Sequence, residues 1–294
     1  DRLEFNGTLA LNVRPGSLTG APYISANNGT SSGVFGIMNG FGPTRIWVTD
    51  SAPLGGEAEP SFATGVSDPL NFRIPTIGEM NRTDDHETNQ LQKEFAEIRV
   101  DDRNVRVTAV GTSGFWVSDL TDAPGNYSGL FVYPFNKPED VKVGDRIGLL
   151  AGGVQEYVGA TQLSFPLYEA VEGETLNPPE RVVLPNDELC EGSDPNNLWL
   201  EQYESSIVTI ESATIPENFQ AAEPGTDPDP DYNQFLEYGQ WPIELPSGCR
   251  MYVVSKTTVP QFDPVEYAGQ DVGPITGVVS YVRAGGHKWM LLAR

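Results

Sequence analysis

The chain has 294 residues, 31 glycines, 24 prolines and a formal net charge of −23 at pH 7. Its length allows two or three domains, and its composition favours short strands and turns over long helices. So acidic a surface repels polyphosphates over long range, which argues against nucleic acid as the ligand. No run of about 18 apolar residues occurs, so we expect no membrane-spanning helix.

Short strand-like runs separated by turns fill residues 1–76. The clearest of them are Leu3–Phe5, Thr8–Val13, Gly33–Met38, Thr44–Thr49 and Phe72–Ile74. About seven short strands over this length predict an immunoglobulin-like β-sandwich. The simplest role for such a domain is that of a spacer.

Residues 77–98 carry the pattern of a helix. Asp84 and Glu87 have the spacing of a capping box, and apolar residues then recur on one face: Leu91, Phe95 and Ile98. We expect a helical linker over residues 77–96. His86 lies among acidic neighbours and is a metal-ligand alternative, but acids at a helix N-terminus are explained by the helix dipole.

Residues 97–172 predict a closed five-stranded barrel, because five strand-like runs alternate with turns at close spacing. The runs are Val105–Val110, Phe115–Val117, Gly129–Tyr133, Arg146–Val154 and Thr161–Phe165. Strand alternation places Leu130 and Val132 on one face and Phe131 and Tyr133 on the other. The side chains expected to point into the barrel are those of Val107, Val132, Ile147 and Leu149.

A similar order of runs follows in residues 173–294, after an extended Pro- and Glu-rich link. The runs are Ser206–Ile210, Phe235–Ile243, Cys249–Ser255, Gly277–Arg283 and Lys288–Ala293. They predict a second barrel with a long acidic insertion loop at Glu217–Asn233. The fold class we expect is therefore all-β, with two barrels after the N-terminal sandwich.

Two acidic turns are candidate calcium sites because they gather oxygen ligands. One contains Asp119, Asp122 and Asn126, and the other contains Asp227, Asp229 and Asp231. The second run lacks the glycine and the glutamate that an EF-hand loop needs. The alternatives are Asx-turn chemistry for the first turn and a solvated acidic loop for the second.

No catalytic set stands out in the sequence. The two histidines fall in different predicted domains, and the chain has no nucleophile elbow, P-loop or Cys/His cluster. Carboxylate pairs carry little information in so acidic a chain. We therefore expect a protein that is not an enzyme and has no cofactor, and a hydrolase with an unrecognised site remains the weaker alternative.

Cys190 and Cys249 are the only cysteines. With no motif around either, a disulfide that braces the second barrel is the simplest interpretation. Such a bond is worth about 4 kcal/mol on the chain-entropy model. It would also place the protein in an oxidising compartment.

Aromatic residues of the first barrel are candidates for binding a partner. They are Trp116, Phe131, Tyr133, Phe135 and Tyr157. A groove for single-stranded nucleic acid also needs basic residues, yet residues 97–172 contain six basic against eleven acidic residues. The one basic cluster is formed by Arg99, Arg103 and Arg106. Packing within the barrel is the alternative role of the aromatics.

Four phrases of the first barrel occur together in one known module. They are GFWVSD, SGLFVY, KVGD and GGVQEYVGATQL, in this order. The region resembles the tandem OB-fold, non-catalytic part of secreted bacterial extracellular endonucleases. In the second barrel, Ser205 stands where those proteins have glycine. The resemblance implies two OB folds without the nuclease domain.

From these observations we expect a non-catalytic, extracytoplasmic binding or assembly module with a protein partner. It would be secreted, periplasmic or displayed on the cell surface, and the sequence leaves open whether a lipid anchor precedes Asp1. The resemblance implies an alternative, which is an accessory module that binds nucleic acid or a glycan.

Overall fold

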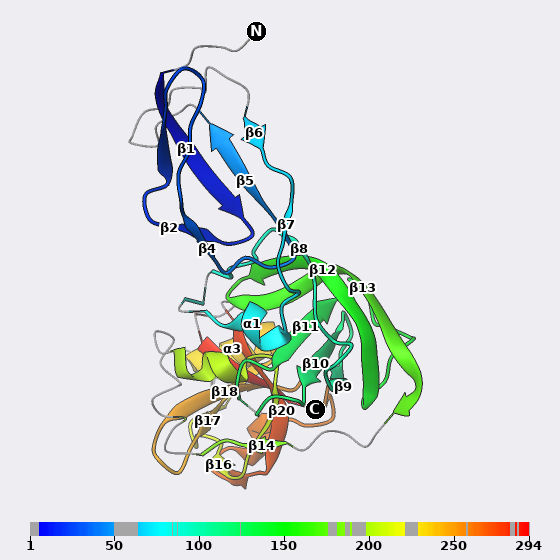
Figure 1. Ribbon diagram of the computed structural model, residues 1–294. Helices are drawn as coiled ribbons and strands as arrows, with labels where there is room; N and C mark the ends of the chain where they lie inside the picture. Colours follow the sequence, from blue (N-terminus) through cyan, green and yellow to red (C-terminus); the bar gives the residue numbers. More distant parts are fainter. Residues whose placement is uncertain are drawn as a thin grey trace. The chain divides into compact units, whose positions relative to one another are not determined.

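The computed structural model describes most of the chain in two compact units, Asp1–Pro75 and Thr76–Arg294 (Figure 1). Both units are built mainly from β-strands, as the sequence predicts. Among the described residues, no helix is long and apolar enough to cross a membrane. The described residues are 6–49, 64–83, 85–86, 88–123, 125–175, 181–185, 189, 198–220, 229–256, 258–282, 286 and 288–293.

The first unit holds one larger sheet and one strand pair. The sheet has the order β3-β1-β5-β6, and β7 also pairs with β5. A separate antiparallel pair is formed by β2 and β4. The bounds are β1 Gly7–Arg14, β2 Ser17–Thr19, β3 Tyr23–Ala26, β4 Gly36–Met38, β5 Pro43–Thr49, β6 Gly65–Val66 and β7 Leu70–Asn71.

The immunoglobulin-like sandwich remains a prediction for this unit. Three of its predicted strands appear as β1, β4 and β5. The predicted final strand Phe72–Ile74 is wrong, because the last strand of the unit, β7, ends at Asn71. The predicted strand Leu3–Phe5 lies outside the described residues. The buried residues described in this unit are few, namely Val13, Ala26, Thr44 and Pro75.

The predicted helix over residues 77–98 is wrong beyond its first turns. Helix α1 spans Ile77–Asn81, and its capping box is formed by Thr76 and Glu79. The chain then turns and forms the short strand β8, Phe95–Glu97. Leu91 is buried, whereas Phe95 is 69% exposed, so the apolar stripe does not lie on one face. The predicted capping pair, Asp84 and Glu87, lies outside the described residues.

The five-stranded barrel is confirmed. Strand β11 pairs with β10 and, in parallel, with β13, and β12 pairs with both β13 and β9 and so closes the sheet. Helix α1 packs against β10 and β11. The bounds are β9 Val105–Val110, β10 Phe115–Asp119, β11 Gly129–Tyr133, β12 Asp145–Tyr157 and β13 Ala160–Thr175.

The predicted register of the barrel is confirmed at Val107, Val132 and Ile147, which have no exposed surface. It is wrong at Leu149, which is half-buried, while Leu150 takes the core position. The reason is a register shift in β12 between Ile147 and Leu149. An extra residue in a strand moves all later side chains to the opposite face.

The second part of Thr76–Arg294 is an eight-stranded sheet with the order β14-β15-β20-β21-β18-β17-β16-β19. Its strands are β14 Val182–Val183, β15 Ile207–Ile210, β16 Ala213–Thr214, β17 Gln240–Glu244, β18 Arg250–Val254, β19 Asp271–Val272, β20 Ile275–Val282 and β21 Lys288–Ala293. Two 3₁₀ helices accompany it, η1 Leu198–Tyr203 and η2 Pro264–Tyr267. Its core includes Trp241, Val253, Val279 and Trp289.

The strand pairing of this sheet follows that of the barrel. As in β11 and β13, the parallel pair β18 and β21 lies between antiparallel pairs. Strands β15 and β16 lie apart in the order, yet only two residues separate them in the chain. A second closed OB barrel stays a prediction, and the structure shows the sheet.

Helix α3, Pro230–Tyr238, corrects two predictions for the second sheet. The predicted strand Phe235–Ile243 is helical up to Tyr238, and the predicted acidic loop ends in this helix. Asp229 caps the helix by accepting from the backbone of Asp231, and Gly239 ends it in the left-handed conformation. Aspartate as N-cap, proline in the first turn and a terminal glycine are ordinary helix boundaries.

The barrel and the sheet meet at backbone level beside Gly129. A Cβ atom at this glycine would lie 2.5 Å from the carbonyl carbon of Ser205 and 2.6 Å from the nitrogen of Ser206. Ser205 itself has φ +60°, a left-handed conformation that favours glycine. No side chain fits between the two segments at this point.

We therefore expect Gly129→Ala to lower the free energy of unfolding by about 1–3 kcal/mol, because backbone atoms cannot move aside as a flexible side chain can. Gly153→Ala is the matched control, since its Cβ would meet its nearest neighbour at an ordinary 3.5 Å. Urea unfolding of the full chain measures both. Equal stability of the two variants would contradict the close contact at Gly129.

Candidate functional site

Five aromatic rings form a continuous series on the outer face of the barrel. Neighbouring ring centroids are 4.7, 5.9, 4.5 and 4.6 Å apart. We call this series the aromatic ladder, and its members in spatial order are Trp116, Phe131, Tyr133, Phe135 and Phe165. It crosses β10, β11 and β13, so residues far apart in the chain contribute to one surface.

Strand alternation places the first rings of the ladder outside. Leu130 and Val132 fill the barrel, which turns Phe131 and Tyr133 outward, and Trp116 pairs directly with Phe131 across β10 and β11. The turn before β10 leaves room for the rings. A Cβ at Gly114 would lie 2.9 Å from the Phe131 ring.

The far end of the ladder is strained and exposed. Phe135 has φ +68° and Phe165 has φ +51°, and their side chains are 50% and 73% exposed. Bulky residues rarely adopt this region of backbone conformation, and doing so costs on the order of 1–3 kcal/mol. The chain therefore holds two large apolar rings at the surface against both backbone preference and hydration, which is a feature of ligand-binding sites.

The structure brings together four of the five predicted aromatics and adds one. Tyr157 ends β12 and is exposed, and its ring touches no other ring among the described residues. Phe165 was not among the predicted aromatics, and no local pattern places its ring beside Phe135. A register shift places one residue of β12 opposite two of β13, Phe165 and Pro166.

A cleft of about 400 Å³ lies at the Trp116 end of the ladder. One wall is the turn between β9 and β10, and the other is formed by the second sheet through Val254, Val278 and Leu292. Lys137 also lines it. Ligand pockets typically occupy 300–1,000 Å³ between domains, so the cleft extends the ladder into a deeper apolar recess.

Polar side chains beside the ladder are satisfied by one another. Gln155 accepts hydrogen bonds from Gln162 at 3.2 Å and from Ser164 at 2.7 Å. By contrast, the Trp116 indole nitrogen and the Tyr133 hydroxyl make no hydrogen bond within the described part of the chain. The ladder thus leaves two groups unpaired, the Trp116 N–H, which only donates, and the Tyr133 hydroxyl, which donates and accepts.

The first calcium candidate is occupied by a guanidinium. The Nε atom of Arg103 lies 2.6 Å from Asp119, whose side chain is fully buried, and the same guanidinium pairs with Asp122. The third candidate ligand, Asn126, accepts a hydrogen bond from Arg82. A cation would have to displace Arg103, so the three residues serve here as an ion-pair network.

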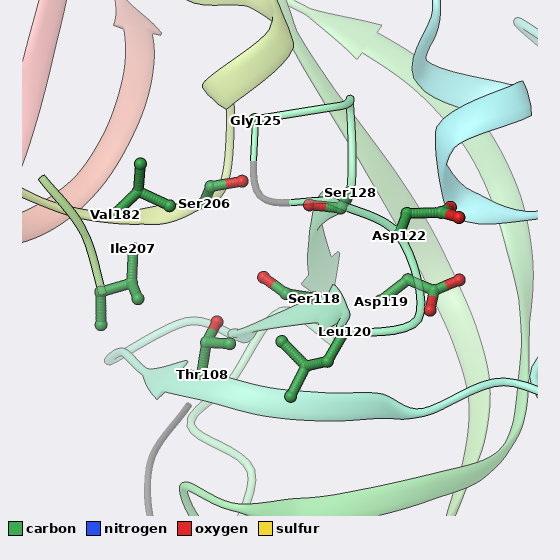
Figure 2. Close-up of a pocket in the computed structure, with 10 residues that line it drawn as sticks. All are labelled: Thr108, Ser118, Asp119, Leu120, Asp122, Gly125, Ser128, Val182, Ser206 and Ile207. Carbon is green, nitrogen blue, oxygen red and sulfur yellow. The ribbon is translucent and has the colours of Figure 1, made fainter. Parts of the chain in front are cut away.

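A cavity of about 230 Å³ adjoins this network, between the barrel and β14–β15 (Figure 2). Figure 2 shows the carboxylates of Asp119 and Asp122 on the side away from Ser206 and Val182. The hydroxyl of Ser206 is buried and has no hydrogen-bond partner among the residues that the structure describes. The lining of the cavity is mixed, with the hydroxyls of Ser118, Ser128 and Ser206 beside the apolar side chains of Leu120, Val182 and Ile207.

The described residues of the second calcium candidate do not form a common site either. Asp229 caps α3, while Asp231 pairs with Arg250 at 2.8 Å and accepts from the Tyr252 hydroxyl at 2.9 Å. Asp227 lies outside the described residues. Among the residues that are described, no three His, Cys, Asp or Glu side chains are grouped so as to hold a metal ion.

A buried acid cluster joins the barrel to the second sheet. It consists of His86, Glu156, Glu201 and Glu204. His86 lies 2.7 Å from Glu201 and stacks on Tyr281 of β20 at 4.6 Å. Thr161 donates its hydroxyl to Glu156 and its backbone N–H to Glu204. His86 thus faces inward, while its predicted acidic neighbours Asp84 and Glu87 lie outside the described residues.

Burial dominates the electrostatics of this cluster. It raises the pKa of Glu156 to about 7, and the charge of Glu201 adds to the shift. Burial also raises the pKa of Glu204 well above its usual range, again with a contribution from Glu201. Glu201 and Glu204 are only 3% and 5% exposed, so a substrate cannot reach them in this arrangement. The cluster therefore has a structural role, in which it connects the barrel to the second sheet.

The predicted disulfide stays a prediction. Cys249 precedes β18 and packs against the core of the second sheet. Cys190 lies outside the described residues.

Comparison with known proteins identifies no relative. No family model, curated protein or solved structure matches this chain.

Proposed function

We propose that this chain is a non-catalytic binding module and that the aromatic ladder is its binding face. The carrying observation is the pair Phe135 and Phe165, two exposed rings 4.6 Å apart on left-handed backbone. The barrel has the pairing order expected for an OB fold, and the outer face of the second and third strands is where OB folds bind ligands. The ladder lies on these strands, β10 and β11.

A protein partner in an extracytoplasmic compartment suits this face best. Aromatic rings are enriched in protein interfaces, where they combine large apolar area with few rotatable bonds. Nucleic acid is disfavoured because the one basic cluster of the barrel is engaged. Arg99 pairs with Asp102, Arg103 with Asp119 and Asp122, and the buried Arg106 donates to a backbone carbonyl.

Site-specific photo-crosslinking tests the proposal. A photoreactive phenylalanine analogue replaces Phe165 in the full chain, which is then irradiated with an extract of the native source. The control carries the same analogue at Tyr157, which is also exposed but lies outside the ladder. We expect a discrete protein adduct at position 165 that is lost when Phe135→Ala is added. Equal adducts at both positions, or adducts only to nucleic acid, would contradict the proposal.

Removing the exposed rings should separate binding from stability. We expect Phe165→Gly to weaken partner binding at least tenfold, which is about 1.4 kcal/mol. It should change the free energy of unfolding by less than about 1 kcal/mol, because relief of backbone strain offsets the lost ring contact. Urea unfolding and a binding titration on the same sample measure both. A large loss of stability would assign Phe165 to packing rather than to binding.

A further inference from the structure

The ligand class of the ladder follows from three of its properties, on the premise that the ladder is the binding face. Its surface is aromatic along its whole length, the unpaired groups of Trp116 and Tyr133 can both donate a hydrogen bond, and it belongs to a strongly acidic chain. Each property removes one kind of ligand. Together they leave a narrow class of protein segment.

The negative charge of the chain argues against polyanions as ligands of the ladder. The chain has 41 acidic and 18 basic residues. The barrel's arginines are paired: Arg99, Arg103 and Arg146 have carboxylate partners, and Arg106 is buried. The field therefore steers cationic ligands toward the protein and anionic ones away. At contact, exposed aromatic faces such as those of Phe135 and Phe165 also attract cations.

The hydrogen-bonding groups of the ladder and its neighbours favour a peptide over a glycan as the ligand. A sugar ring presents several hydroxyls that need acceptors as well as donors, yet Gln155, Gln162 and Ser164 beside the ladder are bonded to one another. Of the ladder's own side chains, only the Tyr133 hydroxyl is an unpaired acceptor. A polyproline II segment offers exposed backbone carbonyls and, at each proline, no N–H that needs an acceptor. Its carbonyls match the two donors that the ladder leaves free, on Trp116 and Tyr133.

The elongated shape of the ladder also favours a polyproline II ligand. A polyproline II segment is extended before it binds, so it loses little conformational entropy on an elongated site. Its pyrrolidine rings pack on aromatic side chains in known recognition grooves. The ladder, with the cleft beside Trp116 at one end, is an elongated aromatic surface of this kind.

We infer that the aromatic ladder binds a proline-rich, basic segment of a partner protein in the polyproline II conformation. The segment's prolines contact the rings between Trp116 and Phe165. Its basic side chains lie against the exposed rings of Phe135 and Phe165, away from Lys137 in the cleft beside Trp116.

Synthetic peptides titrated into the full chain test this inference. The probes are a repeat of Pro-Pro-Arg, a repeat of Pro-Pro-Glu and a repeat of Gly-Ser-Arg, all of equal length and followed by calorimetry. We expect the Pro-Pro-Arg peptide to bind at least tenfold more tightly than either of the others. Its affinity should fall at least tenfold in Phe135→Ala and in Phe165→Ala but not in Tyr157→Ala.

Other results would reject either the proline-rich ligand or the ladder as the binding face. Equal affinity for Gly-Ser-Arg would show attraction by charge alone, and absence of peptide binding would also reject the inferred ligand. A neutral oligosaccharide or single-stranded DNA that binds only when Phe165 is present would reject the proline-rich ligand while the ladder remains a binding face. Tight Pro-Pro-Arg binding that is unchanged in both ladder variants would reject the ladder itself as the face.

Discussion

Replacing Arg103 with methionine is expected to lower the free energy of unfolding by about 3 kcal/mol. The guanidinium lies 2.6 Å from the fully buried Asp119 and also pairs with Asp122. Methionine keeps much of the packing but leaves a buried carboxylate without its counter-charge, and breaking a buried pair in this way typically costs 3–5 kcal/mol. Asp119 keeps one backbone hydrogen bond, from Thr121, which places the loss at the lower end. Urea unfolding of the full chain measures it.

Two variants make this test specific. Arg99→Met removes a guanidinium from an exposed pair with Asp102, so it should leave the stability unchanged. Adding Asp119→Asn to Arg103→Met removes the uncompensated charge, so it should recover most of the loss. A double variant no more stable than the single one would show that Arg103 acts through packing alone.

Stability should fall as the pH rises from 4.5 to 7 because of the buried acid cluster. The folded-state pKa of Glu156 is about 7, above its usual value of 4.5. Such a group contributes its full stability below pH 4.5 and loses it as the pH approaches 7, by on the order of 3 kcal/mol. The raised pKa of Glu204 acts in the same direction and extends the loss to higher pH.

The Glu156→Gln variant isolates this contribution, because glutamine cannot ionise. The groups around Glu156 are Thr161, His86, Glu201 and Asp85, and they remain in the variant. We expect the variant to equal the parent near pH 4.5 and to be the more stable of the two at pH 8. Glu169→Gln, at an exposed position of β13, should follow the parent at both values. Parallel stability curves for Glu156→Gln and the parent would contradict the buried site.

The sequence was sufficient to predict the barrel because its signals are local. Alternation and turns set the five strands, and the same alternation set the outward direction of Phe131 and Tyr133. The helix α3 also had a local signal, since Asp229 and Pro230 have the order of an N-cap and first turn and Gly239 ends the helix. It was missed because acidic residues and prolines were interpreted as a loop.

The remaining features depend on contacts that no local pattern contains. Register shifts in β12 moved Leu149 out of the core and brought Phe165 into the ladder. The acid cluster joins residues that are up to 118 positions apart, from His86 to Glu204, and carboxylate pairs are too common in this chain to single it out. The pairing of Arg103 with Asp119 likewise appeared only when the strand ends were placed together.

Selective ¹³C labelling of the phenylalanine rings tests the central claim most directly. NMR spectra of the full chain are recorded while the Pro-Pro-Arg peptide is added, and single variants assign the signals of the 13 phenylalanines. We expect the signals of Phe131, Phe135 and Phe165 to shift most and those of the buried Phe115 and Phe219 to remain unchanged. Peptide binding that shifts other phenylalanines while these three remain unchanged would contradict the aromatic ladder as the binding face.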